Sequence, residues 1–115
     1  KNNVTGNSIG IYLRESNQNT IYLNDFIDNL QNALSSDSEN TWHSPEQISY
    51  SSAGKSYTSL LGNYWSDYEG NDSNGDGLGD ASYSFEYDGQ DEHPLMTTSS
   101  DLFKPKMTYK GMVID

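Results

Sequence analysis

Apolar and polar residues in the first third of the chain follow a pattern that repeats after 22 residues. The motif Asn-x-apolar-x-x-Asn occupies residues 2–7 and returns at residues 24–29, and at the same offset Ile11 corresponds to Ala33. Inside this repeat, asparagine recurs every five residues from Asn19 onward. The spacing is too short for a pair of helices. It predicts strands of about three residues, each directing one or two apolar side chains inward and joined by polar corners.

Repeats of about 20–25 residues built from short strands and polar turns are typical of a parallel β-helix. We therefore predict that residues 1–34 form two coils of such a helix. The asparagines are expected to adopt left-handed backbone geometry at the corners and to form hydrogen-bonded ladders between coils. Because a coil buries its apolar face only against other coils, we expect more of them ahead of Lys1 in a longer parent protein. A short helix over residues 28–34 is the open alternative, since the three apolar residues of this segment have helical spacing.

The periodicity weakens after the second coil. Residues 48–59 contain two strand-like runs around Ser52-Ala-Gly54, which predicts a hairpin. The chain then becomes dense in Gly, Asp and Tyr and poor in apolar residues, so we expect residues 35–100 to form an irregular, loop-rich cap. Residues 101–115 are predicted to be a linker or the start of a further module.

Composition limits how such a fold is stabilised. The 115 residues are 32% apolar, with nine tyrosines and no cysteine, so neither a thick aliphatic core nor disulfides can hold the chain. The formal net charge of −11 disfavours nucleic acids and anionic membrane surfaces but suits divalent cations. No apolar run is long enough to span a bilayer, and we expect export and anchoring signals to lie outside these residues. We interpret the chain as an excised segment of an extracellular protein.

The loop at residues 72–80 is the clearest candidate for a metal site. Its oxygen-bearing side chains are Asp72, Asn74, Asp76 and Asp80, at loop positions 1, 3, 5 and 9. Glycine, Gly77, is at position 6. Ca²⁺ takes about six to eight oxygen ligands, and alternate residues of a tight loop can reach one point. We predict a calcium site in which Leu78 contributes its carbonyl oxygen and turns its side chain toward a core. The open alternative is an acidic, glycine-rich turn that binds nothing specific.

The predicted calcium shell is incomplete. Position 12 of the loop is Tyr83, where the helix–loop–helix calcium motif has a bidentate glutamate, and no helical pattern flanks the loop. Glu86, Asp88 or Asp91 could fold back to complete the shell, and the sequence does not choose among them. We therefore expect a weak site, with a dissociation constant on the order of 10⁻⁴–10⁻³ M.

Aromatic residues precede the loop. Trp42, Tyr64, Trp65 and Tyr68 are predicted to plug the open end of the coil stack, because a core-poor chain needs its rings for packing; stacking on sugar faces is the alternative.

Two glycosylation sequons complete the set of candidate sites. They begin at Asn3 and Asn71. A glycan at Asn71 would crowd the proposed metal loop.

Four motifs in a fixed order resemble a known family. The motifs are Asn40-Thr-Trp42, Gly62-Asn-Tyr64-Trp65-Ser-Asp67-Tyr68, the 72–80 loop and Asp91-Glu-His93-Pro94-Leu-Met96. They are similar to the C-terminal portion of NosD-like right-handed β-helix domains, also called carbohydrate-binding and sugar-hydrolysis (CASH) repeats. Such domains are common in surface and S-layer-type proteins of methanogenic archaea. The resemblance covers roughly residues 1–96 and implies a mainly β, right-handed parallel β-helix displayed at the cell surface, often in tandem modules.

The family name also implies copper delivery and sugar chemistry. Copper favours clusters of His, Met or Cys, whereas His43 and His93 stand far apart in the sequence and cysteine is absent, so we expect no copper site. Glycosidases need two carboxylates across a bound ring, but the two coils carry mainly Asn, Ser and Thr. We assign no catalytic residue.

The sequence thus predicts a non-catalytic segment that terminates and stabilises an extracellular β-helix with the help of Ca²⁺. Its expected partners are neighbouring domains of the same chain, and cell-surface polysaccharide is a second candidate. Neither nucleic-acid binding nor membrane insertion is expected. The alternative function is a carbohydrate-binding module, or part of a polysaccharide-degrading β-helix enzyme.

Overall fold

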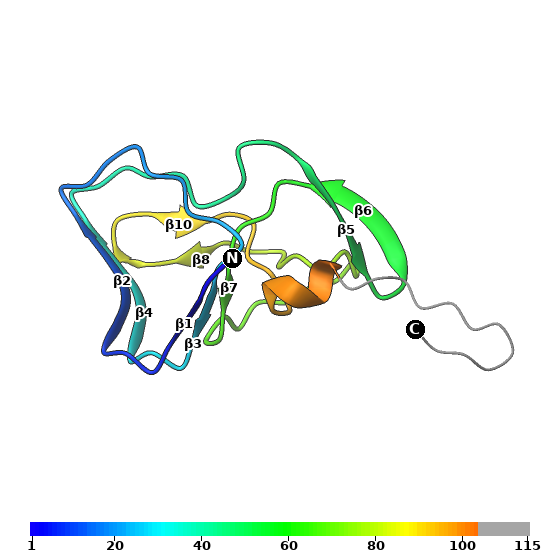
Figure 1. The fold of residues 1–115 in the computed structure, drawn as a ribbon, viewed down its shortest axis with the longest axis horizontal. Coiled ribbons are helices and arrows are strands. Elements are labelled where there is room, and N and C mark those ends of the chain that lie inside the picture. Colours follow the sequence, from blue (N-terminus) through cyan, green and yellow to red (C-terminus); the bar gives the residue numbers. More distant parts are fainter. Residues whose placement is uncertain (104–115) are drawn as a thin grey trace, which may run out of the picture.

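The computed structural model describes residues 1–103, which form a mainly β chain of short strands (Figure 1). The strands are β1 Asn3–Thr5, β2 Ile9–Arg14, β3 Asp25–Ile27, β4 Gln31–Ser36, β5 Ile48–Ser52, β6 Lys55–Ser59, β7 Tyr64–Trp65, β8 Tyr83–Ser84, β9 Glu86–Tyr87 and β10 Gln90–Asp91, and a 3₁₀ helix, η1, spans Ser99–Phe103. The predicted linker at residues 101–115 begins inside η1, and residues 104–115 lie outside the described part.

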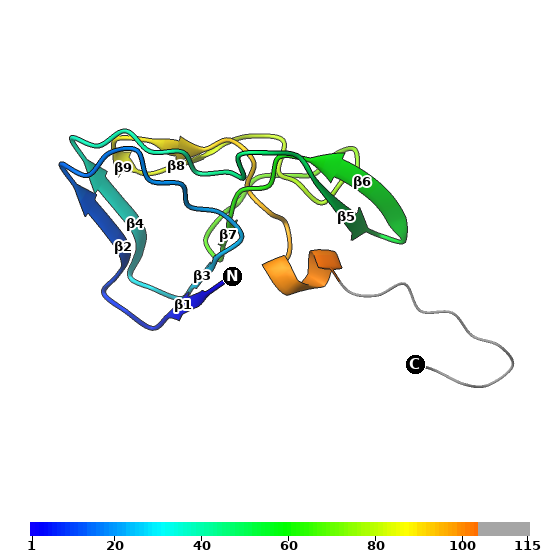
Figure 2. The ribbon, with the colours of Figure 1, turned by 45° about the horizontal axis from the view of Figure 1, so that its top comes forward.

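Two parallel three-stranded sheets organise the chain, with the orders β1-β3-β7 and β2-β4-β9. In Figure 2 the chain runs along β1, turns upward along β2 and crosses back to the start of β3, so each turn has three sides. Each turn therefore adds one strand to each sheet, and successive turns lie on one another.

The register between the first two turns is the 22-residue offset that the sequence predicts. Val4 pairs with Phe26 in the first sheet, and Ile11 pairs with Ala33 in the second. The helix considered for residues 28–34 is wrong, because strand β4 begins within that segment.

A third strand joins each sheet from the segment predicted to be an irregular cap. In β7, Trp65 pairs with Phe26 in parallel, and in β9, Glu86 pairs with Leu34. The predicted hairpin is present as the antiparallel pair β5–β6, which extends away from the turns (Figure 1). The proposed division at residue 34 is therefore not a break in the sheets, which continue into the later segment.

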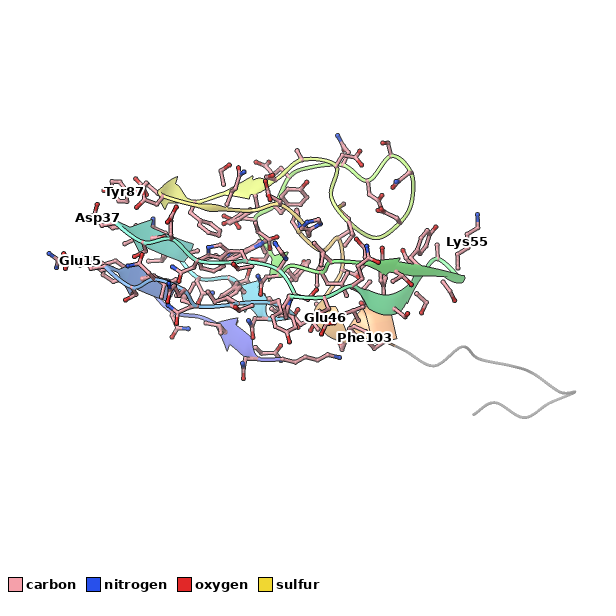
Figure 3. The ribbon with its side chains drawn as sticks, turned by 90° about the horizontal axis from the view of Figure 1, so that it is seen from above. Glu15, Asp37, Glu46, Lys55, Tyr87 and Phe103 are labelled. Carbon is pink, nitrogen blue, oxygen red and sulfur yellow. The ribbon has the colours of Figure 1, made fainter. Side chains whose placement is uncertain are left out.

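Residues with positive φ mark the corners of successive turns. Gly6 and Asp28 have φ values of 73° and 55°, and Glu15, Asp37 and Tyr87 have values of 47°, 50° and 74°. Figure 3 shows the last three one above another at one edge of the molecule. Within the described residues no asparagine has positive φ. The prediction that asparagine supplies the left-handed corners is therefore wrong.

The asparagines instead form the predicted ladders between turns. Asn2 Nδ2 donates to Asn24 Oδ1 at 3.1 Å, and Asn24 Nδ2 donates to Asn63 Oδ1 at 3.2 Å, which links three turns. On another corner, Asn7 donates through both its backbone N and its Nδ2 to Asn29 Oδ1. An amide side chain has both donors and an acceptor, so identical residues in register can bond to one another repeatedly.

The buried apolar residues form two clusters. One lies inside the turns and is aromatic; its buried members are Phe26, Ala33, Trp42, Trp65 and Phe85. The other lies between the turns, the hairpin and η1; its buried members are Leu23, Tyr50, Leu61, Leu78, Leu95 and Leu102. Asp25 of β3 fixes η1, because its carboxylate accepts hydrogen bonds from the backbone N and the hydroxyl of Ser99.

Candidate functional site

The 72–80 loop is organised around the carboxylate of Asp72. Asp72 Oδ1 accepts hydrogen bonds from the backbone N of Gly75 at 2.9 Å and of Asp76 at 3.2 Å, and its Oδ2 accepts one from Gly77 N at 2.8 Å. Gly75 and Gly77 have φ values of 75° and 84°, so the sharp turn predicted at Gly77 is present. The loop is the yellow-green ring in Figure 3, with side chains directed into it.

Two further predicted ligands lie beside Asp72. Asn74 Oδ1 accepts a hydrogen bond from Asp76 N at 3.2 Å, and Asp76 Oδ1 accepts one from Leu78 N at 2.9 Å. Asp72, Asn74 and Asp76 are therefore gathered by the same stretch of backbone. The side chain of Leu78 is buried in the second apolar cluster, as predicted.

Asp80 has a separate role in the loop. Its Oδ2 accepts hydrogen bonds from the hydroxyl and the backbone N of Ser73, at 2.7 and 2.9 Å, and these bonds lower the pKa of Asp80. Among residues 1–103, no three His, Cys, Asp or Glu side chains form a group that could hold a metal ion. The loop thus brings together three of the four predicted oxygen-bearing side chains, while Asp80 is turned to Ser73.

The three carboxylates considered for completing the shell are engaged elsewhere. Glu86 accepts a hydrogen bond from Gln31 Nε2 at 2.8 Å, and Asp88 accepts one from Ser38 N at 3.3 Å. Asp91 is fully buried within the third turn. The loop is held instead by the hairpin, because the hydroxyl of Tyr50 donates to the carbonyl oxygen of Asp76 at 2.7 Å. Burial, with the negative charge of Asp76 second, raises the pKa of Tyr50 to about 12.

The aromatic residues predicted to plug the stack are mostly packed inside it. Trp65 is 1% exposed and lies between Phe26 and Tyr83, with ring centroids 4.5 Å from each and nearly parallel planes. Trp42 is 3% exposed and meets Phe85 edge to face. Neither tryptophan can stack on a sugar, because neither ring face reaches solvent. Tyr64 and Tyr68 are partly buried against the two clusters.

Asp91 is a structural residue that the sequence did not reveal. Its Oδ2 accepts hydrogen bonds from Asn63 N at 2.7 Å and Trp65 Nε1 at 2.9 Å, and its Oδ1 accepts one from His93 N at 2.8 Å. Burial raises the pKa of this carboxyl, and the hydrogen bonds oppose that rise. A Cβ on Gly62 would collide with the Asp91 carboxylate, so this position requires glycine. The signal available in the sequence was the buried indole N–H, which needs an acceptor.

The two histidines are close together, contrary to the inference drawn from their separation in sequence. The rings of His43 and His93 have centroids 5.1 Å apart and an interplanar angle of 77°. Both residues are half-buried. Burial, and secondly the charge of His43, lower the pKa of His93, while Glu92 opposes this shift.

Both sequons are accessible. Asn3 in β1 and Asn71 before the loop are exposed, and the Asn71 carbonyl accepts a hydrogen bond from Asp80 N at 2.7 Å. Glycosylation at either position stays a prediction.

Parallel strands stacked in register, with asparagine ladders beside the corners, define a mainly β protein built from repeated turns. A family model described as "Periplasmic copper-binding protein (NosD)" matches residues 1–70. The chain belongs to the NosD family, as the sequence motifs indicated. No curated protein and no solved structure matches the chain. In the described residues, no helix has the length and apolar character needed to cross a membrane.

Proposed function

We propose that this segment terminates and stabilises an extracellular right-handed parallel β-helix, without catalysis, and binds Ca²⁺ in the 72–80 loop. The observation that supports it best is the difference between the two ends of the strand stack. One end exposes apolar surface in the register of a further turn, and the other is covered by rings and loops. In this proposal the neighbours of the segment are other domains of the same chain at a cell surface.

The end formed by the first turn is open. It contains a cavity of about 320 Å³, and the apolar residues that line it are Val4, Ile11, Ile21 and Phe26. Val4 and Ile11 remain only half-buried, whereas Phe26 and Ala33, their partners in the second turn, are buried. Another turn placed on this end would bury the same positions again.

The opposite end is covered. Tyr83 stacks on the outer face of Trp65, and its hydroxyl donates to Asp67 Oδ1 at 2.9 Å. Leu95 bridges to both Tyr64 and Leu78, which ties the segment after β10 over the third turn. Rings and loop backbone therefore occupy the place where a fourth turn would lie, which supports a terminating role.

The calcium part of the proposal is supported by the loop geometry and the charge. Asp72, Asn74 and Asp76 present five oxygens along one tight turn, and the chain has a formal net charge of −11. Their contacts in the structure are N–H groups of the same loop, and a cation bound by these oxygens would replace part of that bonding. The ligand role of Asp80 and of the Leu78 carbonyl remains part of the proposal.

Thermal unfolding with Ca²⁺ and with a chelator tests this function. Calcium at ten times its dissociation constant is expected to stabilise the fold by about 1.4 kcal/mol, with a corresponding rise in Tm. Asp72→Asn should abolish the rise, and Asp37→Asn, which changes an exposed carboxylate outside the loop, should retain it. An unchanged midpoint in wild type at millimolar calcium would rule out the calcium part.

A carbohydrate-binding role is the second candidate, and one observation favours it. Tyr12 and Tyr87 belong to the same sheet and are 52% and 75% exposed, in contrast to the buried tryptophans. Exposed tyrosines are suited to stacking on sugar faces while their hydroxyls stay hydrated. A glycan array with wild type and Tyr12→Ala tests this role. Equal, background signals for both proteins would remove it.

Copper, which the family description names, is not part of the proposed function. Residues 1–70, which match the family model, contain one histidine, no methionine and no cysteine. Copper sites in proteins use clusters of these residues. The donor set of the matched segment therefore does not fit a copper centre.

A further inference from the structure

His43 and His93 are the only histidines of the chain, and the fold places their rings in contact. Their backbones are fixed by the segment between them. Ser44 N donates to Leu61 O at 2.8 Å, and Gly62 N donates to His93 O at 2.9 Å. Leu61 is fully buried, so this segment gives both histidines a rigid base.

One hydrogen bond orients the ring of His43. Its Nδ1 lies 2.7 Å from the carbonyl oxygen of Ser44. A carbonyl oxygen only accepts, so Nδ1 donates this bond, and in the neutral form of the ring the lone pair is on Nε2. Metal-binding histidines commonly donate their second ring N–H to a carbonyl in this manner, which orients the ring and makes the ligating nitrogen more basic.

The separation of the rings matches a shared ion. When two imidazoles bind one ion through nitrogens at about 2.0–2.1 Å and at a roughly tetrahedral angle, their centroids lie about 5 Å apart. The observed separation of His43 and His93 is 5.1 Å. Both residues are only half-buried, which leaves the pair accessible from solvent.

We propose that His43 and His93 form a two-imidazole site for a first-row transition cation such as Zn²⁺ or Ni²⁺. Imidazole suits these borderline ions, whereas Ca²⁺ and Mg²⁺ take oxygen ligands. Since no third His, Cys, Asp or Glu joins the pair within residues 1–103, water completes the coordination and the ion exchanges readily. The site is separate from the 72–80 loop. It also does not follow from the family match, because His93 lies beyond residue 70.

Proton NMR of the whole chain tests the pair directly, because only two imidazole C2–H signals exist. Substoichiometric Ni²⁺ should broaden both signals together. Broadening of one signal alone, or of neither, overturns the proposal. This measurement uses wild type and does not depend on whether any variant folds.

Titration calorimetry with Zn²⁺ gives the second measurement. One ion should bind per chain, and His43→Gln and His93→Gln should each weaken binding at least tenfold. Asp72→Asn, in the calcium loop, should leave Zn²⁺ binding unchanged. Two ions per chain, or wild-type affinity in either histidine variant, contradicts a shared site. If Ca²⁺ does not raise the Tm of wild type but Zn²⁺ still binds to it, the calcium proposal fails and the two-imidazole site stands.

Discussion

At the scale of single residues, the third turn depends on one buried carboxylate. Asp91 accepts from two backbone N–H groups and the Trp65 indole, and Asp91, Asn63 and Trp65 are all buried. Local spacing predicted the turn at Gly77 and the inward side chain of Leu78, because both depend on neighbours within one loop. It could not predict the role of Asp91, because its partner Asn63 lies 28 residues away in the sequence. No repeat in the sequence relates these two positions.

Replacing Asp91 by Asn should destabilise the fold. An amide has one oxygen where the carboxylate has two, so its NH₂ group would face either His93 N or the N–H groups of Asn63 and Trp65. A buried donor left without an acceptor costs about 1–3 kcal/mol. Urea unfolding measures this loss. Asp88→Asn, which removes a carboxylate with a single 3.3 Å bond, is the matched control and should cost about 0.5 kcal/mol or less. Equal losses in both variants would contradict the assigned role.

Tyr83 should make stability fall at alkaline pH. Burial, and secondly the hydrogen bond to Asp67, raise the pKa of Tyr83 above its ordinary value of 10.0. The folded state therefore keeps the proton at a pH where the unfolded chain releases it. Stability from this group is complete below pH 10 and is lost as the pH rises further.

The variant Tyr83→Phe isolates this group. The difference in unfolding free energy between wild type and Tyr83→Phe should be constant near neutral pH and should shrink between pH 10 and 11. Urea unfolding across this range measures it, and the other tyrosines cancel in the difference. A difference that grows with pH would mean that the phenol pKa is lowered.

At the scale of elements, the sequence predicted the strands that repeat and the local hairpin, and it missed the short strands that complete the third turn. β1 to β4 share a motif at a fixed offset, so their pairing could be inferred without coordinates. β7 and β9 are two residues long and pair at longer offsets, because the hairpin and the 72–80 loop interrupt the third turn. The corners were predicted with the wrong residue, because ladder bonding fixes the asparagines beside the corners rather than in them.

Asn63 joins the ladders to the third turn, so Asn63→Ala should be costly. Asn63 is 0% exposed; its Oδ1 accepts from Asn24 N, and its Nδ2 donates to the carbonyl oxygen of Ile21 at 3.0 Å. Each buried group left unpaired costs about 1–3 kcal/mol. Asn2→Ala, at the exposed end of the same ladder, should change stability by about 0.5 kcal/mol or less. Chemical denaturation of both variants tests this gradient, and a larger loss at Asn2 would refute it.

At the scale of the whole molecule, one covered end and one open end predict how the segment responds to extension. A designed 22-residue turn fused ahead of Lys1, with apolar residues aligned to Val4 and Ile11, should bury the open cavity and raise Tm. A fused turn of equal length with serine at those inward positions is the control and should not raise Tm. If the fused apolar turn and the fused serine turn both lower Tm, the open end does not accept a further turn.

The ladders also have a direction. The backbone N of Asn7, Asn19 and Asn24 each donates to an asparagine oxygen of the following turn. An added turn ahead of the first one could donate its backbone N–H groups to the side-chain oxygens of Asn2, Asn7 and Asn19, as these turns do among themselves. A second copy meeting this end face to face would not repeat this direction of bonding. The polarity of the ladders therefore favours one more turn over a face-to-face contact between two copies of the segment.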